Sequence, residues 1–313
     1  MIAVVGDTTL DVAVRPDGPM RTGGDVEAQI VLGVGGQGAN VAVRLARRGL
    51  TVRLITALAT DAVSDLIRSR LAAEQLELAA LPAERASVVV AILDEKGERT
   101  MLSDRVGVMG NLLPLLADVA WIHVSGYVLR DAREAAGLQA AIRARAARPR
   151  LSVAGGSVLD GADLEIFRDA ISVLSPDLLV LSRDEASAVL GGGAPSLADT
   201  AADLAIDGRL AIVTGGAEGS AAAAPWLDAA LTVEPQPIDP PPTDATGAGD
   251  AYLAALIGAL FECPWPPDAS TIRGGMERAS ELGARVTRVP GAQGHVDGEH
   301  ESSAAFQDSA HAR

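Results

Sequence analysis

Short runs of apolar residues recur along this chain, and they alternate with longer segments in which apolar residues repeat every three or four positions. Apolar runs without internal alternation are typical of parallel strands that are buried on both faces. The runs of this kind are 2–5, 52–57, 121–124, 151–154, 178–181 and 211–214. The segments with helical spacing are 41–48, 64–74, 130–145, 186–190, 198–207 and the alanine-rich stretch 251–257. This order predicts an α/β fold with a mostly parallel, doubly wound central sheet and helices on both faces.

Two segments break the alternation of strands and helices. Residues 11–32 and 87–102 have β-type patterns with no helix between their strands, and the second reads as a hairpin turning at 94–97. We expect them to form a small β-sheet lid over one edge of the central sheet, from segments at about 12–34 and 86–106. Residues 1–293 then form one domain, and the polar tail 294–313 is expected to be disordered.

Composition narrows the class of protein. Apolar residues make up 48% of the chain, enough for a large core, and the formal net charge of −15 argues against nucleic acid as a partner. Cys263 is the single cysteine, so an intrachain disulfide is excluded, and the four histidines show no zinc-ligand spacing. No long apolar run and no signal-peptide pattern is present, so we expect a cytoplasmic protein without a membrane partner.

The stretch 244–250 (Asp-Ala-Thr-Gly-Ala-Gly-Asp) leads directly into the apolar helix at 251–257. The free N–H groups and the dipole at a helix N-terminus attract anions, and Gly247, Ala248 and Gly249 let a phosphate approach the backbone closely. Asp250 would repel that phosphate unless it takes a proton from a hydroxyl that attacks it. The alternative from these residues alone is an ordinary aspartate helix cap.

A second glycine cluster spans 33–40 and contains the spacing G-x-G-x-x-G at Gly33, Gly35 and Gly38. One interpretation is a dinucleotide-binding turn, with Asp61 about 20 residues later as the ribose-binding acid. That fingerprint should close the first strand, which here ends near Gly6. The other interpretation is that a small polyhydroxy substrate lies against the bare backbone.

Polar residues also follow several predicted strands, at the edge where open α/β sheets bind ligands. Asp11, after the first strand, is suited to accept hydrogen bonds from sugar hydroxyls, or it is a turn aspartate. Glu185, after the strand at 178–181, is a candidate Mg²⁺ ligand, or a first-turn acid of a helix. The glycine turn 214–219 is a candidate contact for a ribose or for phosphates, or a tight connection.

The order of these motifs resembles the PfkB/ribokinase family of carbohydrate kinases. Residues 35–40 (Gly-Gly-Gln-Gly-Ala-Asn) and 244–250 resemble its two signature regions, and the resemblance covers residues 1 to about 293. It implies a ribokinase-like fold and ATP-dependent phosphoryl transfer to a hydroxyl of a sugar or nucleoside. Such transfer relies mostly on positioning and charge stabilisation, which suits the turn at 247–250.

The resemblance also assigns roles to individual residues. Asp250 would be the general base, and the turn of Gly247, Ala248 and Gly249 would form an anion hole for the transferring phosphoryl group. The substrate-binding residues would be Asp11, Gly35, Gly36, Gln37 and Asn40. The nucleotide-binding residues would be Ser182, Thr214, Gly216 and Gly219. Glu185 would hold Mg²⁺, and Asp244 and Thr246 mark a possible K⁺ site.

The chain departs from the family pattern at three positions and in the segment 288–292, which is one residue longer than usual. Gln37 stands where many ribokinases carry lysine, Ser182 replaces the asparagine of an Asn-x-x-Glu motif, and Thr9 replaces an asparagine that contacts ribose. The acceptor therefore stays open among ketohexoses, ketoacid sugars, ribose and nucleosides. A non-catalytic sugar or nucleotide sensor and an NAD-dependent enzyme are the alternatives. The β lid also predicts a homodimer, because exposed sheet edges and faces tend to be covered.

Overall fold

The computed structural model describes residues 1–93, 99–145, 147–157, 160–238 and 244–296. Nine strands form the large sheet in the order β13-β12-β11-β10-β9-β8-β1-β4-β5, and the strands from β11 to β5 are parallel. The strands are β1 Ile2–Val5, β4 Val52–Leu58, β5 Glu77–Pro82, β8 Trp121–Val124, β9 Arg150–Ala154, β10 Leu178–Ser182, β11 Leu210–Thr214, β12 Ser220–Ala223 and β13 Leu231–Val233. The predicted doubly wound, mostly parallel sheet is thus confirmed.

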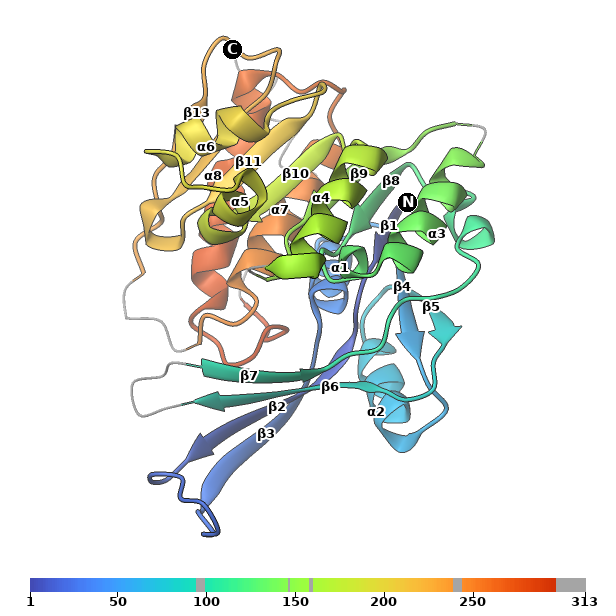
Figure 1. The fold of residues 1–313 in the computed structure, drawn as a ribbon, viewed down its shortest axis with the longest axis vertical. Coiled ribbons are helices and arrows are strands. Elements are labelled where there is room, and N and C mark those ends of the chain that lie inside the picture. The colour runs from blue at the N-terminus through green and yellow to red at the C-terminus, as the bar shows by residue number, and fades with distance from the viewer. Residues whose placement is uncertain (94–98, 146, 158–159, 239–243, 297–313) are drawn as a thin grey trace.

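Helices cover both faces of this sheet (Figure 1). One face carries α1 Gln37–Arg47, α2 Ala62–Leu71, α7 Ala248–Phe261 and α8 Ala269–Val286, and the other carries α3 Ala132–Arg143, α4 Gly161–Leu174, α5 Arg183–Leu190 and α6 Leu197–Leu204. Successive side chains of a strand point to opposite faces, so β10 sends Leu178 and Val180 into one core and Leu179 and Leu181 into the other. This double burial explains why the strands appear as continuous apolar runs.

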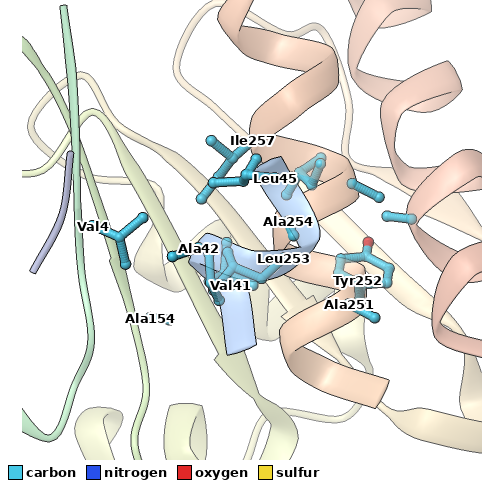
Figure 2. Close-up of a cluster of buried hydrophobic side chains, with 14 of the residues drawn as sticks. Val4, Val41, Ala42, Leu45, Ala154, Ala251, Tyr252, Leu253, Ala254 and Ile257 are labelled. Carbon is cyan, nitrogen blue, oxygen red and sulfur yellow. The ribbon is translucent and has the colours of Figure 1, made fainter. Parts of the chain in front are cut away.

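Helix α7 is apolar all round because other elements enclose it. It packs on α8 and α1, and the close-up in Figure 2 shows Val41, Ala42 and Leu45 of α1 near the α7 side chains Leu253 and Ile257. Alanines on both helices leave room for a close approach of the two backbones. The packing fixes the N-termini of α1 and α7 relative to each other.

A second, four-stranded sheet projects from the bottom of the molecule in Figure 1. Its order is β3-β2-β6-β7, with β2 and β6 parallel and both edge strands antiparallel to their neighbours. The strands are β2 Thr9–Pro16, β3 Ala28–Gly35, β6 Ser87–Leu93 and β7 Arg99–Asp104. The two β-type segments of the sequence therefore do form one separate small sheet.

The predicted elements are confirmed with shifted ends. Helix α1 begins at Gln37 rather than at 41, and the helix predicted at 130–145 is α3, Ala132–Arg143, which follows a short 3₁₀ turn at Val128–Arg130. The patterns did not predict α4, α8, β5, β12 or β13. The hairpin turn 94–97 lies outside the described residues, as does the predicted disordered tail from 297 onward. None of the helices in the described ranges is long and apolar enough to cross a membrane.

Candidate active site

The candidate site lies at the carboxyl edge of the large sheet. From β1 the chain goes first to β4 on one side and later to β8 on the other, and open α/β sheets bind ligands at such a switch point. The residues that follow β1 and β8 meet there, because Ser125 Oγ donates to Asp7 Oδ1 over 3.2 Å. The fold therefore brings buried polar side chains together at this point.

Asp250 lies in the first turn of α7, beside the N-terminus of α1. Gly247 caps α7 in the left-handed region with φ of 78°, and a Cβ there would lie 2.7 Å from Ala292 Cα, so glycine is required. The N–H of Ala248 donates to Ala245 O over 3.3 Å. Within the described residues, the next two N–H groups, of Gly249 and Asp250, have no hydrogen-bond acceptor. This turn is suited to bind an anion.

Asn40 and Asp250 are joined directly, although 210 residues separate them in sequence. Asn40 Nδ2 donates to Asp250 Oδ2 over 2.7 Å. Removal of the carboxyl from water raises the pKa of Asp250 to about 7, and the nearby Asp7 and Asp11 also raise it. The hydrogen bond from Asn40 and the charge of Arg44 act in the opposite direction on this pKa. A carboxyl with a pKa near neutrality is a better proton acceptor than an ordinary aspartate.

Asp11 lies on β2 of the small sheet, rather than in a turn. Thr9 Oγ1 donates to Asp11 Oδ1 over 2.5 Å, and burial raises the pKa of Asp11. A Cβ at Gly35 would lie 1.9 Å from Asp11 Oδ2, so the bare backbone of β3 makes space for this carboxylate. The charge of Asp11, on the small sheet, raises the pKa of Asp250, on α7.

Gln37 and Gly36 stand at the start of α1. Gln37 Nε2 donates to Gly155 O over 2.6 Å, and Gly126 N donates to Gln37 Oε1 over 3.1 Å. Both ends of this amide therefore bind backbone of the loops after β8 and β9. A Cβ at Gly36 would lie 2.6 Å from Asp7 O, so the absence of a side chain lets this turn approach the backbone after β1 closely.

The sequence patterns did not predict a group of charged and aromatic residues that also lies at this edge of the large sheet. Arg105, just after β7, forms an ion pair with the buried Asp7, and its guanidinium lies 4.0 Å from the ring centroid of Tyr127. Burial raises the pKa of Tyr127, which also feels the charge of Asp250. Arg105 therefore ties the end of the small sheet to the carboxyl end of β1. No local motif marks these residues, since they come together only in the fold.

The candidate nucleotide-binding residues lie side by side farther along the same edge. Ser182 and Thr214 are paired across β10 and β11. Glu185 Oε2 accepts from Ser182 N over 2.8 Å, and Ser182 Oγ accepts from Glu185 N over 3.3 Å, which makes a capping box at the start of α5. The turn that follows β11 is closed by a hydrogen bond from Gly215 N to Gly219 O of 2.8 Å and includes Gly216.

Asp244 joins the loop before α7 to the loop after α8. Its Oδ1 accepts from Thr246 N over 2.9 Å, its Oδ2 accepts from Gly291 N over 2.9 Å, and its own N–H donates to Thr287 O over 3.0 Å. The loop that holds the candidate K⁺ residues Asp244 and Thr246 is therefore in contact with the loop after α8. Across the described ranges, His, Cys, Asp and Glu side chains do not gather in groups of three that could hold a metal by themselves.

The geometry does not fit the dinucleotide-binding interpretation of the glycine cluster. Gly33 and Gly35 lie on β3, which is antiparallel to β2 in the small sheet, so the cluster does not close a strand of a βαβ unit. Asp61 caps α2, accepting from Ser64 N over 2.7 Å and from Ala86 N over 3.0 Å. That interpretation is therefore set aside.

Comparisons with known proteins agree with this arrangement. Residues 1–297 match the model of the pfkB family carbohydrate kinases. A fructokinase of Klebsiella pneumoniae is 28% identical over 310 residues, covering 93% of this chain and 94% of that protein. In fold, the chain is similar to a fructokinase of Vibrio cholerae O395 solved with fructose, ADP and calcium, at a TM-score of 0.75 and 23% identity over 98% of this chain and 97% of that one.

A ribokinase of Thermotoga maritima has the same fold at a TM-score of 0.75, with 18% identity over 98% of this chain and 99% of that one. The family model spans nearly the whole sequence, and its match includes both glycine clusters and every candidate residue described above. The chain therefore belongs to the pfkB family of carbohydrate kinases.

Proposed function

We propose that this protein transfers the γ-phosphoryl group of ATP to a hydroxyl of a sugar or sugar-like small molecule, with Asp250 as general base. The observation that carries the proposal is the position of Asp250, whose carboxyl has a pKa raised to about 7 and lies beside the free N–H groups at the start of α7. A proton acceptor and an anion-binding turn thus share one place. Both would act on the same transfer step.

In this proposal, residues near the small sheet bind the acceptor and residues beside the large sheet carry out the phosphoryl transfer. Asp11, Gly35 and Gly36 would hold the acceptor from the small sheet and the start of α1. Asp250 would take the proton of the attacking hydroxyl, while the N–H groups of the turn 247–250 would stabilise the transferring group. The small sheet would act as a lid that keeps out water, which otherwise competes as acceptor. Asn40 touches Asp250 directly and would tune it rather than contact only the acceptor.

The nucleotide would lie along the ends of β10 and β11, against Ser182, Thr214, Gly216 and Gly219. One carboxylate is sufficient for Mg²⁺ when the phosphates supply the other ligands. Glu185 fits that role, because it lies at the end of β10 beside the bare backbone of Gly155. Mg²⁺ neutralises phosphate charge when it is bound. The joined loops around Asp244 and Thr246 would place backbone oxygens for K⁺, and replacement of K⁺ by Na⁺ or Li⁺ tests that site.

We rank the acceptors by the relatives of this chain. The similarity to fructokinases puts fructose first among the ketohexoses, ahead of ribose, ketoacid sugars and nucleosides. The test is an ADP-release screen with ATP, Mg²⁺ and K⁺ against all of these. We expect acceptor-dependent ADP release with at least one sugar. Binding of a sugar by calorimetry without turnover on any acceptor would favour the sensor alternative instead.

We further propose a homodimer formed through the small sheet. Leu32, Val12, Val90 and Leu102 lie in one row across its four strands, and Leu32 and Leu102 at the edges are 52% and 55% exposed. An apolar row whose two ends are exposed at the edges of a sheet is typical of an interface. Light scattering should give the dimer mass for the wild type and the monomer mass for Leu32→Glu. A wild type that stays monomeric at micromolar concentration would contradict the dimer.

A further inference from the structure

Two side-chain amides, those of Gln293 and Asn40, connect the last turn of the described chain to Asp250 by hydrogen bonds. Gln293 Nε2 donates to Asn40 Oδ1 over 3.0 Å, and Asn40 Nδ2 donates to Asp250 Oδ2 over 2.7 Å. The two ends of an amide differ, since the nitrogen end donates and the oxygen end accepts. The bond from Gln293 therefore fixes which end of Asn40 faces the carboxylate.

The backbone that carries Gln293 is held independently of its side chain. Arg44 Nη2 donates to Ala292 O over 2.7 Å, and Arg47 Nη1 donates to Gln293 O over 2.8 Å. Both arginines are buried in α1, and Arg47 is itself fixed by two bonds to Glu74, of 2.9 and 2.6 Å. Helix α1 thus positions Asn40 and Gln293 together, so a change at the Gln293 side chain leaves its backbone anchored.

We propose that Gln293 is a positioning residue for Asp250, which it controls by orienting the Asn40 amide with its N–H toward the carboxylate. The inference rests on the proposed function for its catalytic meaning, because it treats Asp250 as the base. Its physical consequence is separate from catalysis. The N–H of Asn40 lowers the pKa of Asp250 and so opposes the effect of burial. Without the donor from Gln293, Asn40 is free to turn its oxygen toward Asp250.

Two substitutions distinguish an orienting donor from a simple filler of space. Gln293→Met keeps the length of the side chain and removes the N–H. Gln293→Glu keeps the shape but accepts when it is ionised, so Asn40 would turn its N–H toward residue 293 and present its oxygen to Asp250. We expect the pKa of Asp250 to rise in both variants, by about half a pH unit or more, and more in Gln293→Glu.

The measurement is the titration of aspartate side-chain carbons by ¹³C NMR on labelled full-length protein, with the Asp250 resonance assigned from its loss in Asp250→Asn. The matched control is Glu74→Gln, which loosens the Arg47 anchor but removes no amide donor. We expect the control to lower the melting temperature and to leave the Asp250 midpoint where it is in the wild type. Melting curves of the Gln293 variants verify that they fold.

The inference is overturned if folded Gln293→Met and Gln293→Glu titrate at the wild-type midpoint. It is equally overturned if Glu74→Gln moves the Asp250 midpoint as far as Gln293→Met does. The backbone anchor of residue 293, and not its side-chain donor, would then control Asp250. Neither result depends on turnover. If the acceptor screen finds no kinase activity while the Gln293 variants do shift the titration, the proposed function fails and the orienting role stands. In an active enzyme, the acid limb of kcat against pH should move in the same direction.

Discussion

The large sheet and the small sheet are built from similar apolar residues but use them differently. Strands β8, β10 and β11 of the large sheet are buried between two helical layers, so their side chains hold the fold together. In the small sheet, edge strand β3 exposes a run of apolar side chains, among them Ile30 at 61% and Leu32 at 52%. The small sheet gains little stability from these side chains, which leaves them available for contact with something else.

The difference also separates the chemical roles. Asp250 belongs to the layer packed on the large sheet and is fixed by helix–helix contacts, whereas Asp11 belongs to the small sheet. The ion pair between Arg105 and Asp7 joins the two regions. A general base benefits from a rigid surrounding structure, whereas an acceptor-binding residue benefits from a segment that can open and close. We therefore expect substitutions in the large sheet to lower the stability of the fold and substitutions in the small sheet to change ligand binding.

The largest contrast should appear when one leucine from each sheet is truncated. Leu179→Ala in β10 removes a fully buried side chain, and we expect it to lower the free energy of unfolding by about 2–5 kcal/mol. Leu32→Ala should change the stability of the monomer by about 0.5 kcal/mol or less. Urea unfolding at low protein concentration checks both values. Similar losses from the two variants would show that the small sheet is packed in solution.

A smaller effect is expected at the junction of the two regions. Glu134 of α3 is buried against Gly107 in the segment after β7, and burial raises its pKa to about 7, with Asp131 and Asp7 adding to the rise. Because the folded state holds this proton more tightly than the unfolded state, stability falls as pH rises from about 4 through 7.

Glu134→Gln cannot ionise, so it should reduce the loss of stability between pH 5 and pH 8 by about 1–2 kcal/mol. Part of the slope should remain, since the raised pKa of Asp250 acts in the same direction. Thermal unfolding across this pH range gives the measurement, with the exposed Glu165→Gln on α4 as the matched control. An unchanged slope in Glu134→Gln would mean that the junction opens before this carboxyl ionises.

The smallest effect should separate binding from turnover. Gly35→Ala places a Cβ within 1.9 Å of Asp11 Oδ2 and must displace that carboxylate, whereas Gly33→Ala on the same strand meets nothing within 4 Å. We expect Gly35→Ala to raise KM for the acceptor about tenfold, with a smaller change in kcat. Steady-state kinetics of the pair is the check. Equal KM values would remove Asp11 from acceptor binding.

The sequence predicts the scaffold well where one physical signal dominates. Doubly buried strands leave continuous apolar runs, and the predicted bounds of β1 and β8 are those of the structure. Strand β12 was not predicted because its sequence, Ser-Ala-Ala-Ala, has little β propensity and is held by pairing with β11. Helix α8 was not predicted, although Ile272, Met276, Ala279, Leu282 and Val286 recur at helical spacing; the glycines of this segment lower its helix propensity.

In the candidate site, too, the residues that a local sequence pattern marks were predicted and the others were not. Asp250 and Asn40 were predicted because each stands beside a glycine-rich turn that opens a helix. Gln293 and Arg105 were not, since their partners lie 253 and 98 residues away in sequence and no local pattern records such contacts. Gln37 is predicted to bind the acceptor from its place in the glycine cluster, but the sequence does not reveal that both ends of its amide bond to backbone. Long-range polar contacts are thus what the sequence alone does not reveal.

The most direct test of the account is turnover by Asp250→Asn, measured as ADP release with the best acceptor, alongside calorimetric binding of ATP and of that acceptor. The proposal predicts that both ligands still bind and that kcat falls by about 10²–10⁴-fold, because the amide cannot accept the proton of the hydroxyl. A variant that binds both ligands and keeps more than a small fraction of wild-type turnover would contradict the role of Asp250 as base.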